Sequence, residues 1–167
     1  CSPATMASLL ASFGVQVPQR EIAAQITYDG TASMDELEWA RARGFVVRFF
    51  QFDPDTAREL LDAGLPFAIT TRFESAGHRQ AVVGYDRVLD TFLLRDPMAN
   101  FRPEVDATWL TRIARRGGEC ALLLPKEVAE RTPVPPLPGE QATMDWLHLQ
   151  LDWRARRLDA AEPRLAA

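Results

Sequence analysis

The hydrophobic pattern of this chain changes its period near residue 45, and this change restricts the fold more than any other feature. Apolar residues before it recur at helical spacing, and the predicted helices cover residues 3–13, 18–26 and 33–43. Aromatic and β-branched runs after it predict strands over residues 45–52, 66–72, 79–85, 91–95 and 120–124. Two further helices are predicted over residues 54–63 and 107–115, the second ended by Gly117-Gly118. Helices followed by hairpin-linked strands indicate an α+β fold with N-terminal helices packed on an antiparallel sheet.

Two of the predicted helix starts carry end signals. Ser2 is expected to cap the first helix, with Pro3 at its first helical position. Ser33 and Glu36 have the spacing of a capping box, in which each side chain bonds the backbone N–H of the other residue. We therefore assign Ser2, Ser33 and Glu36 to helix capping.

A proline-rich segment, Thr132–Gly139, separates this pattern from a last predicted helix over residues 141–161. Closely spaced prolines prevent both a helix and an inner strand, so we expect an extended, polyproline-like linker. The predicted organisation is a compact domain at 1–127, a linker at 128–140 and a helical extension at 141–167. The extension either belongs to another structural unit or packs back on the domain.

The 167-residue chain carries a formal net charge of -4, which argues against nucleic acid or an anionic membrane surface as a partner. The arginine clusters at 112–116 and 154–157 are interpreted as solvated helix faces. No apolar run reaches the ~18–20 residues of a membrane span and no signal peptide is visible, so we expect a cytoplasmic protein. The cysteines and histidines lie too far apart in sequence for a disulfide framework or a zinc site, and no cofactor is predicted.

Cys1 stands directly before the first predicted helix. Unpaired N–H groups and the dipole at a helix start favour the thiolate, which is the nucleophilic form of cysteine. The position alone also fits an ordinary terminal residue. Cys120 falls in the last predicted strand and is expected to be a buried core residue. Of the two cysteines, Cys1 is therefore the candidate for chemistry.

A candidate base and a candidate carboxylate lie on two successive predicted strands. His78 precedes the first residue of one strand, and Asp96 follows the last residue of the next. The connection between the strands lies near the midpoint of the two positions, so an antiparallel hairpin would bring the side chains together. Asp96 could then hold the imidazole in one tautomer, and Asp86 and Asn100 are weaker candidates for that role. His148 lies beyond the proline-rich segment and is a poor candidate for the base.

A series of short motifs follows over residues 1–125. They are Cys1-Ser2-Pro3-Ala4, Gly30-Thr31-Ala32-Ser33, Leu61-Asp62-Ala63-Gly64-Leu65-Pro66, the strand from His78 to Gly84, and Asp96-Pro97. Each motif is common by itself. Their joint order and spacing resemble the C39-like branch of the papain-fold cysteine peptidases, a group that includes the leader-processing domains of bacterial bacteriocin exporters.

This resemblance implies a papain-like fold, hydrolysis of peptide bonds in a peptide or protein substrate, and no metal or cofactor. It implies Cys1 as nucleophile, His78 as general base and acid, and Asp96 as the group that orients the base. The family has an oxyanion-hole glutamine several residues before the cysteine, so we expect this chain to be part of a longer one. Ser2 stands where the family usually has glycine. Exporter-linked members cut after paired glycines, but nothing in this sequence alone indicates that preference.

The segment 141–167 is similar to the start of a tetratricopeptide array, which would provide a contact with a protein partner. Three other interpretations of the chain stay open. Cys1 could be an N-terminal nucleophile that uses its own amine as base, or a lipidated cysteine. The helix that starts directly after Cys1 argues against both, because the first usually begins a strand and the second a flexible spacer. The third is a non-catalytic C39-like domain that binds peptides, although such domains commonly lack the cysteine.

Overall fold

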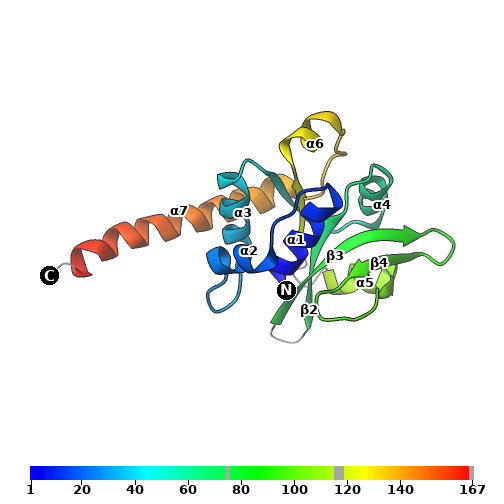
Figure 1. The fold of residues 1–167 in the computed structure, drawn as a ribbon, viewed down its shortest axis with the longest axis horizontal. Helices are drawn as coiled ribbons and strands as arrows, with labels where there is room; N and C mark the ends of the chain where they lie inside the picture. Colours follow the sequence, from blue (N-terminus) through cyan, green and yellow to red (C-terminus); the bar gives the residue numbers. More distant parts are fainter. Residues whose placement is uncertain (74–75, 115–118, 166–167) are drawn as a thin grey trace.

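The computed structural model describes residues 1–73, 76–114 and 119–165, and Figure 1 shows its fold. The helices are α1 (Ser2–Ser12), α2 (Gln19–Ile26), α3 (Ser33–Ala42), α4 (Pro54–Asp62), α5 (Ala107–Ala114), α6 (Lys126–Arg131) and α7 (Glu140–Leu165). The strands are β1 (Val46–Gln51), β2 (Phe67–Phe73), β3 (Ala76–Asp86), β4 (Thr91–Arg95), β5 (Glu104–Asp106) and β6 (Glu119–Leu124). The sequence pattern predicted all of these except α6 and β5. The predicted end of α5, at Arg115 and Gly117-Gly118, lies outside the described residues.

The strands that the structure describes form one sheet in the order β1-β6-β2-β3-β4-β5. Every neighbouring pair among them is antiparallel. The last long strand, β6, enters between β1 and β2 and pairs with both of them. This arrangement confirms the predicted α+β class with an antiparallel sheet.

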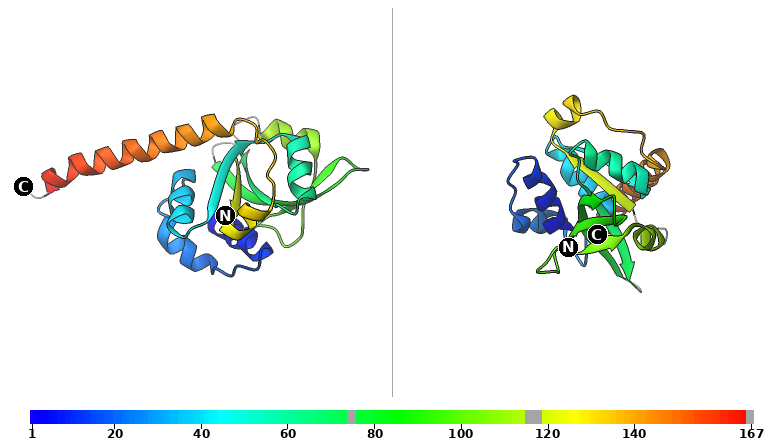
Figure 2. Two further views of the ribbon diagram at one scale, coloured as in Figure 1. Left: turned by 90° about the horizontal axis from the view of Figure 1, so that it is seen from above. Right: turned by 90° about the vertical axis from the view of Figure 1, so that its right-hand side faces the viewer.

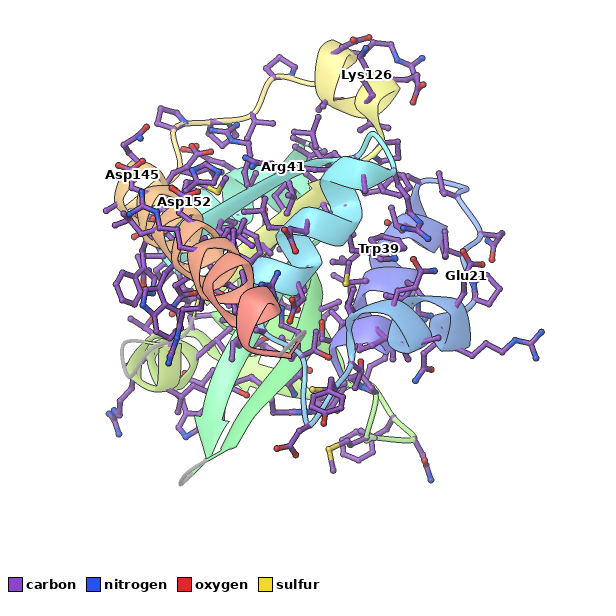
Figure 3. The ribbon with its side chains drawn as sticks, turned by 90° about the vertical axis from the view of Figure 1, so that its left-hand side faces the viewer. Glu21, Trp39, Arg41, Lys126, Asp145 and Asp152 are labelled. Atoms are coloured by element: carbon purple, nitrogen blue, oxygen red, sulfur yellow. The ribbon has the colours of Figure 1, made fainter. Side chains whose placement is uncertain are left out.

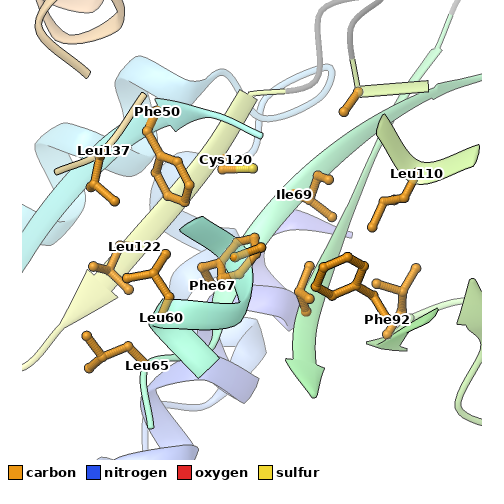
Figure 4. Close-up of a cluster of buried hydrophobic side chains, with 14 of the residues drawn as sticks. Phe50, Leu60, Leu65, Phe67, Ile69, Phe92, Leu110, Cys120, Leu122 and Leu137 are labelled. Carbon is orange, nitrogen blue, oxygen red and sulfur yellow. The ribbon is translucent and has the colours of Figure 1, made fainter. Parts of the chain in front are cut away.

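Helices cover both faces of the sheet. Successive side chains of each strand point to opposite faces, so neighbouring residues of one strand enter different cores. In β1, Phe49 belongs to a core shared with α1, α2 and α3, whereas Phe50 belongs to a core shared with α4 and α5. The views in Figure 2 show the sheet between these two groups of helices. Figure 4 shows the second core, where Phe67, Phe92 and Cys120 lie among leucine side chains. Cys120 is therefore buried, as predicted.

The predicted caps of α1 and α3 are wrong. Ser2 lies inside α1, and its hydroxyl donates a hydrogen bond to Glu36 instead of capping the helix. Ser33 likewise lies inside α3, behind an N-cap at Ala32, and its hydroxyl donates to Glu119. Both serines find carboxylate partners far away in the sequence, which local spacing cannot reveal. Glu36 is buried and takes part in the tertiary structure rather than in a capping box.

The proline-rich segment contains no regular secondary structure, as predicted, but it is hydrogen-bonded to the sheet. Gln51 at the end of β1 donates its backbone N–H to the Pro138 carbonyl, with a nitrogen–oxygen distance of 2.7 Å. Leu137 is buried in the core that contains α4 and α5. The segment therefore crosses the domain surface on its way to α7.

The first half of α7 packs back on the domain, which is one of the two arrangements considered for it. Leu147 is buried in the core of α1–α3, and Arg48 of β1 forms an ion pair with Glu140 at 2.5 Å. Figure 3, which looks along α7, shows this helix beside α3. Arg154 of α7 forms ion pairs with two carboxylates of α3. The C-terminal end of α7 projects away from the domain (Figure 1). The division into domain, linker and extension stays a proposal, and so does the protein partner of this region.

Trp146, Leu149 and Trp153 lie exposed on another side of α7. Despite these apolar side chains, α7 does not have the composition of a membrane span. Within the described ranges, no helix is both long enough and apolar enough to cross a bilayer.

Candidate active site

Cys1 lies at the N-cap of α1, with an exposed side chain. Its carbonyl accepts the first helical hydrogen bond, from the Thr5 N–H at 3.0 Å. Its sulfur accepts a hydrogen bond from the backbone N–H of Arg79, with a nitrogen–sulfur distance of 3.4 Å. Arg79 directly follows His78 in β3. The fold therefore brings the Cys1 thiol to the strand that carries the predicted base.

The imidazole of His78 contacts the Asp96 carboxylate, with 2.7 Å between Nε2 and Oδ1. The ladder between β3 and β4 ends at the pair Ala81 and Arg95, and Asp96 is the next residue after β4. One further step in this register sets Asp96 opposite Gln80, diagonally across from His78. The predicted hairpin therefore does bring His78 and Asp96 together, near the end of the ladder.

Asp96 is surrounded by hydrogen-bond donors besides the imidazole. The backbone N–H of Met98 donates to Oδ1 at 2.7 Å, and the amide of Gln80 donates to Oδ2 at 2.7 Å. Burial by itself would raise the pKa of Asp96. The bonds from Met98, His78 and Gln80 outweigh burial and hold the pKa of this carboxyl below its ordinary value of 3.8. Asp96 is thus an anion at neutral pH, so Nε2 of His78 must be the donor in their hydrogen bond.

The other candidates lie elsewhere in the structure. Asp86 is at the opposite end of β3 from His78, where its carboxylate accepts the N–H groups of Val88 and Leu89 in a turn. His148 lies on α7. Asn100 is exposed in the segment between β4 and β5. Of the predicted groups, Cys1, His78 and Asp96 are the ones that the fold brings to one end of the β3–β4 ladder.

Sequence reasoning missed Gln80, which is buried beside Asp96 and whose own carbonyl oxygen accepts a hydrogen bond from the Thr71 hydroxyl at 3.1 Å. A signal for it was present. Residues two apart on a strand share a face, so a polar residue at position 80 must point to the same side as His78. Arg79 points to the opposite face and enters a buried cluster with Glu36.

A cleft of about 340 Å³ opens beside Cys1. The residues around it come from the start of α1, from α2, from the α2–α3 connection and from the start of β3. They are Cys1, Ser2, Pro3, Gln19, Ala23, Thr27, Gly30, Thr31 and Gly77. Most of these side chains are small, which leaves room for an extended chain next to the sulfur.

Comparison with known protein families gives a match to one family model. The model is described as the Peptidase_C39 like family, and it matches residues 1–114. This range contains Cys1, His78 and Asp96. A comparison with curated proteins found no match to this chain.

Three solved structures resemble the fold. The peptidase domain of Streptococcus ComA, a bifunctional ABC transporter involved in a quorum-sensing pathway, has a TM-score of 0.63 at 20% identity, over 75% of this chain and 91% of that chain. A double-glycine motif protease from an AMS/PCAT transporter, in complex with a leader peptide, has a TM-score of 0.60 at 20% identity, over 75% and 84%. The peptidase domain of Streptococcus mutans ComA has a TM-score of 0.54 at 22% identity, over 75% and 91%. These likenesses confirm the predicted papain-like fold.

Proposed function

The chain belongs to the peptidase C39-like family, and from this we propose that it is a cysteine peptidase that hydrolyses peptide bonds. Cys1 is the nucleophile, His78 is the general base and acid, and Asp96 orients the imidazole. The 2.7 Å contact between Nε2 of His78 and Oδ1 of Asp96 is the observation that carries the proposal. It supports a fixed tautomer, because Asp96 accepts the Nε2 proton and the lone pair of the neutral ring must then lie on Nδ1.

The mechanism uses that lone pair. Nδ1 of His78 takes the proton from Cys1, and the thiolate attacks the carbonyl carbon of the scissile peptide bond. The tetrahedral intermediate collapses to a thioester while His78 returns the proton to the leaving amine. A water molecule then attacks the thioester, loses a proton to His78, and releases the acid and the Cys1 thiol. Asp96 stabilises the imidazolium in both halves of the reaction.

The substrate is proposed to be a peptide or an extended protein segment. The cleft beside Cys1, with its small side chains, supports this class because an unfolded backbone needs room on either side of the bond to be cut. The related AMS/PCAT protease was solved with a leader peptide, which supports the same class of substrate. We propose that the peptide lies in this cleft with its carbonyl against the start of α1.

The test uses the full natural chain, its Cys1→Ala variant and its His78→Ala variant. Each protein is incubated with a library of peptides at pH 7, and cleavage is followed by mass spectrometry. In parallel, limiting iodoacetamide is applied from pH 4 to 9 and the labelled cysteine is mapped. Cys120 is the internal control, because it is buried and burial raises the pKa of its thiol.

We expect the parent to cut peptides and to be labelled at Cys1 well below pH 7, while Cys1→Ala cuts none and keeps its fold. His78→Ala should remove the low-pH labelling. Two results together would overturn the proposal: no cleavage by the parent, and labelling of Cys1 only near pH ~8.5, as for an ordinary thiol. The domain would then be a peptide binder without catalytic activity.

A further inference from the structure

The edge of β3 beside the active site is completed by a helix instead of a strand. Because the ladder with β4 ends at Ala81, the backbone of Arg79 lies beyond it. Its N–H donates to the Cys1 sulfur at 3.4 Å, and its carbonyl accepts from the Thr5 hydroxyl at 3.0 Å. The first turn of α1 therefore takes the hydrogen-bonding positions that the next strand would otherwise fill, and this fixes where the Cys1 thiol lies.

The side chain of Arg79 leaves the opposite face of the strand and is almost fully buried. Its guanidinium forms an ion pair with Glu36 at 2.7 Å and donates to the Thr70 hydroxyl at 2.6 Å. The second oxygen of Glu36 accepts the Ser2 hydroxyl. A series of contacts thus links Ser2, the residue after the nucleophile, through Glu36 to Arg79, whose N–H bonds the Cys1 sulfur.

Stability alone is a weak reason for this ion pair. Side-chain exposure is 5% for Arg79 and 6% for Glu36, so both charges have lost their hydration. Apolar residues of similar volume often serve equally well or better at buried ion pairs. The neighbours Met6, Leu9 and Val47 of Glu36 are apolar and would suit an apolar pair in place of both charges. Such a pair could not bind the Ser2 hydroxyl, which Glu36 does.

We propose that Glu36 and Arg79 are positioning residues for the Cys1 thiol, acting through Ser2 and through the backbone of Arg79. This inference depends on the proposed peptidase function. The ion pair fixes the start of α1 against β3, so the sulfur stays in register with His78 on the same strand. Neither side chain takes part in the chemistry.

The test removes the hydrogen bonds of Ser2 and Thr5, at the two ends of this series of contacts, and leaves the ion pair of Glu36 and Arg79 in place. Ser2→Ala deletes only the hydroxyl that reaches Glu36, and Thr5→Val replaces the hydroxyl that reaches the Arg79 carbonyl by a methyl of the same shape. Thr5→Ser is the conservative variant that restores that hydroxyl. Ser12→Ala is the matched control, because Ser12 ends the same helix and its hydroxyl bonds the nearby Leu9 carbonyl at 2.6 Å.

For the full natural chain, we measure kcat, KM, the alkylation rate of Cys1 against pH, and the melting temperature. Ser2→Ala and Thr5→Val should lower kcat about 5- to 50-fold, since a displacement of ~1 Å in an active site can cost ~10²-fold in rate. Their KM should stay within about twofold of the parent. Thr5→Ser should recover most of the lost kcat, and Ser12→Ala should match the parent.

Parent-like kcat and alkylation rates in both Ser2→Ala and Thr5→Val would refute the positioning role. It would also be refuted if kcat fell only in proportion to the unfolded fraction, with Cys120 becoming labelled. These results differ from a failure of the peptidase function, in which the parent itself cuts no peptide and Cys1 behaves as an ordinary thiol. That last outcome would remove the basis of both proposals.

Discussion

Replacement of Gln80 by methionine tests whether the hydrogen bonds around Asp96 contribute to catalysis. Methionine has nearly the same length and shape, but it offers no amide to the carboxylate. Asp96 would lose the 2.7 Å bond to Oδ2 and keep the donors Met98 and His78. The Thr71 hydroxyl would lose the Gln80 acceptor at 3.1 Å and keep the His78 carbonyl at 3.4 Å. The change therefore loosens the carboxylate that holds the imidazole without removing it.

The size of the effect follows from the kind of bond that is lost. A hydrogen bond to a charged group contributes about 1.5–3 kcal/mol, and the buried thioether recovers part of this through apolar contacts. A net loss of about 1–2 kcal/mol in the orientation of His78 corresponds to a fall in kcat of about 5- to 30-fold. Loss of a donor also raises the pKa of Asp96, so the acid limb of the rate profile should move to higher pH.

The assay is kcat and KM for one cleaved peptide, measured from pH 3 to 8 on the parent, Gln80→Met and Gln51→Met. Gln51 is the matched control, since it also lies on a strand and its amide bonds a neutral hydroxyl, that of Thr143, at 3.2 Å. The Gln51→Met variant should leave kcat within twofold of the parent. If Gln80→Met also kept kcat within twofold at every pH, the hydrogen bonds of Asp96 would have no catalytic role and the reasoning would be wrong.

Two further predictions concern stability. The folded-state pKa of Asp96 lies below 3.8, so the carboxylate stabilises the fold above that value and loses this effect as pH falls through the folded pKa. The difference in unfolding free energy between the parent and Asp96→Asn should therefore shrink from pH 5 to pH 2 in urea titrations, and a constant difference would contradict it. Leu147→Ala should destabilise the protein by about 2–5 kcal/mol, because Leu147 is 2% exposed. Leu149→Ala, 61% exposed on the same helix, should change stability by less than about 0.5 kcal/mol; equal effects would mean that α7 does not pack on the domain.

The fold class could be predicted because the periodicity of side chains reports which faces are buried. Phe49 and Phe50 are neighbours in β1 and belong to different cores, so the apolar pair indicates a strand buried on both faces. The position of β6 between β1 and β2 could not be predicted, because that pairing joins residues far apart in the sequence and many insertions satisfy the same pattern. The short strand β5 has only three residues, too few for a periodic signal.

The site was predictable where it depends on a local hairpin. His78 and Asp96 lie on consecutive strands, and their approach follows from the length of the connection between them. The buried polar cluster was not predictable, because Ser2 and Ser33 are common capping residues and nothing local shows that their partners are Glu36 and Glu119. Tertiary contacts replaced the expected caps at both helices.

The end of β4 and the position of the nucleophile are two consequences of one residue. Extension of the register from Ala81 and Arg95 sets Pro97 directly opposite Arg79. Proline has no N–H and cannot continue the ladder there, so the N–H and carbonyl of Arg79 need other partners. The Cys1 sulfur and the Thr5 hydroxyl supply them. The same break releases Asp96 from the strand, so that its carboxylate meets His78. Pro97, which ends β4, thus determines both where the Asp96 carboxylate lies and where the Cys1 thiol lies.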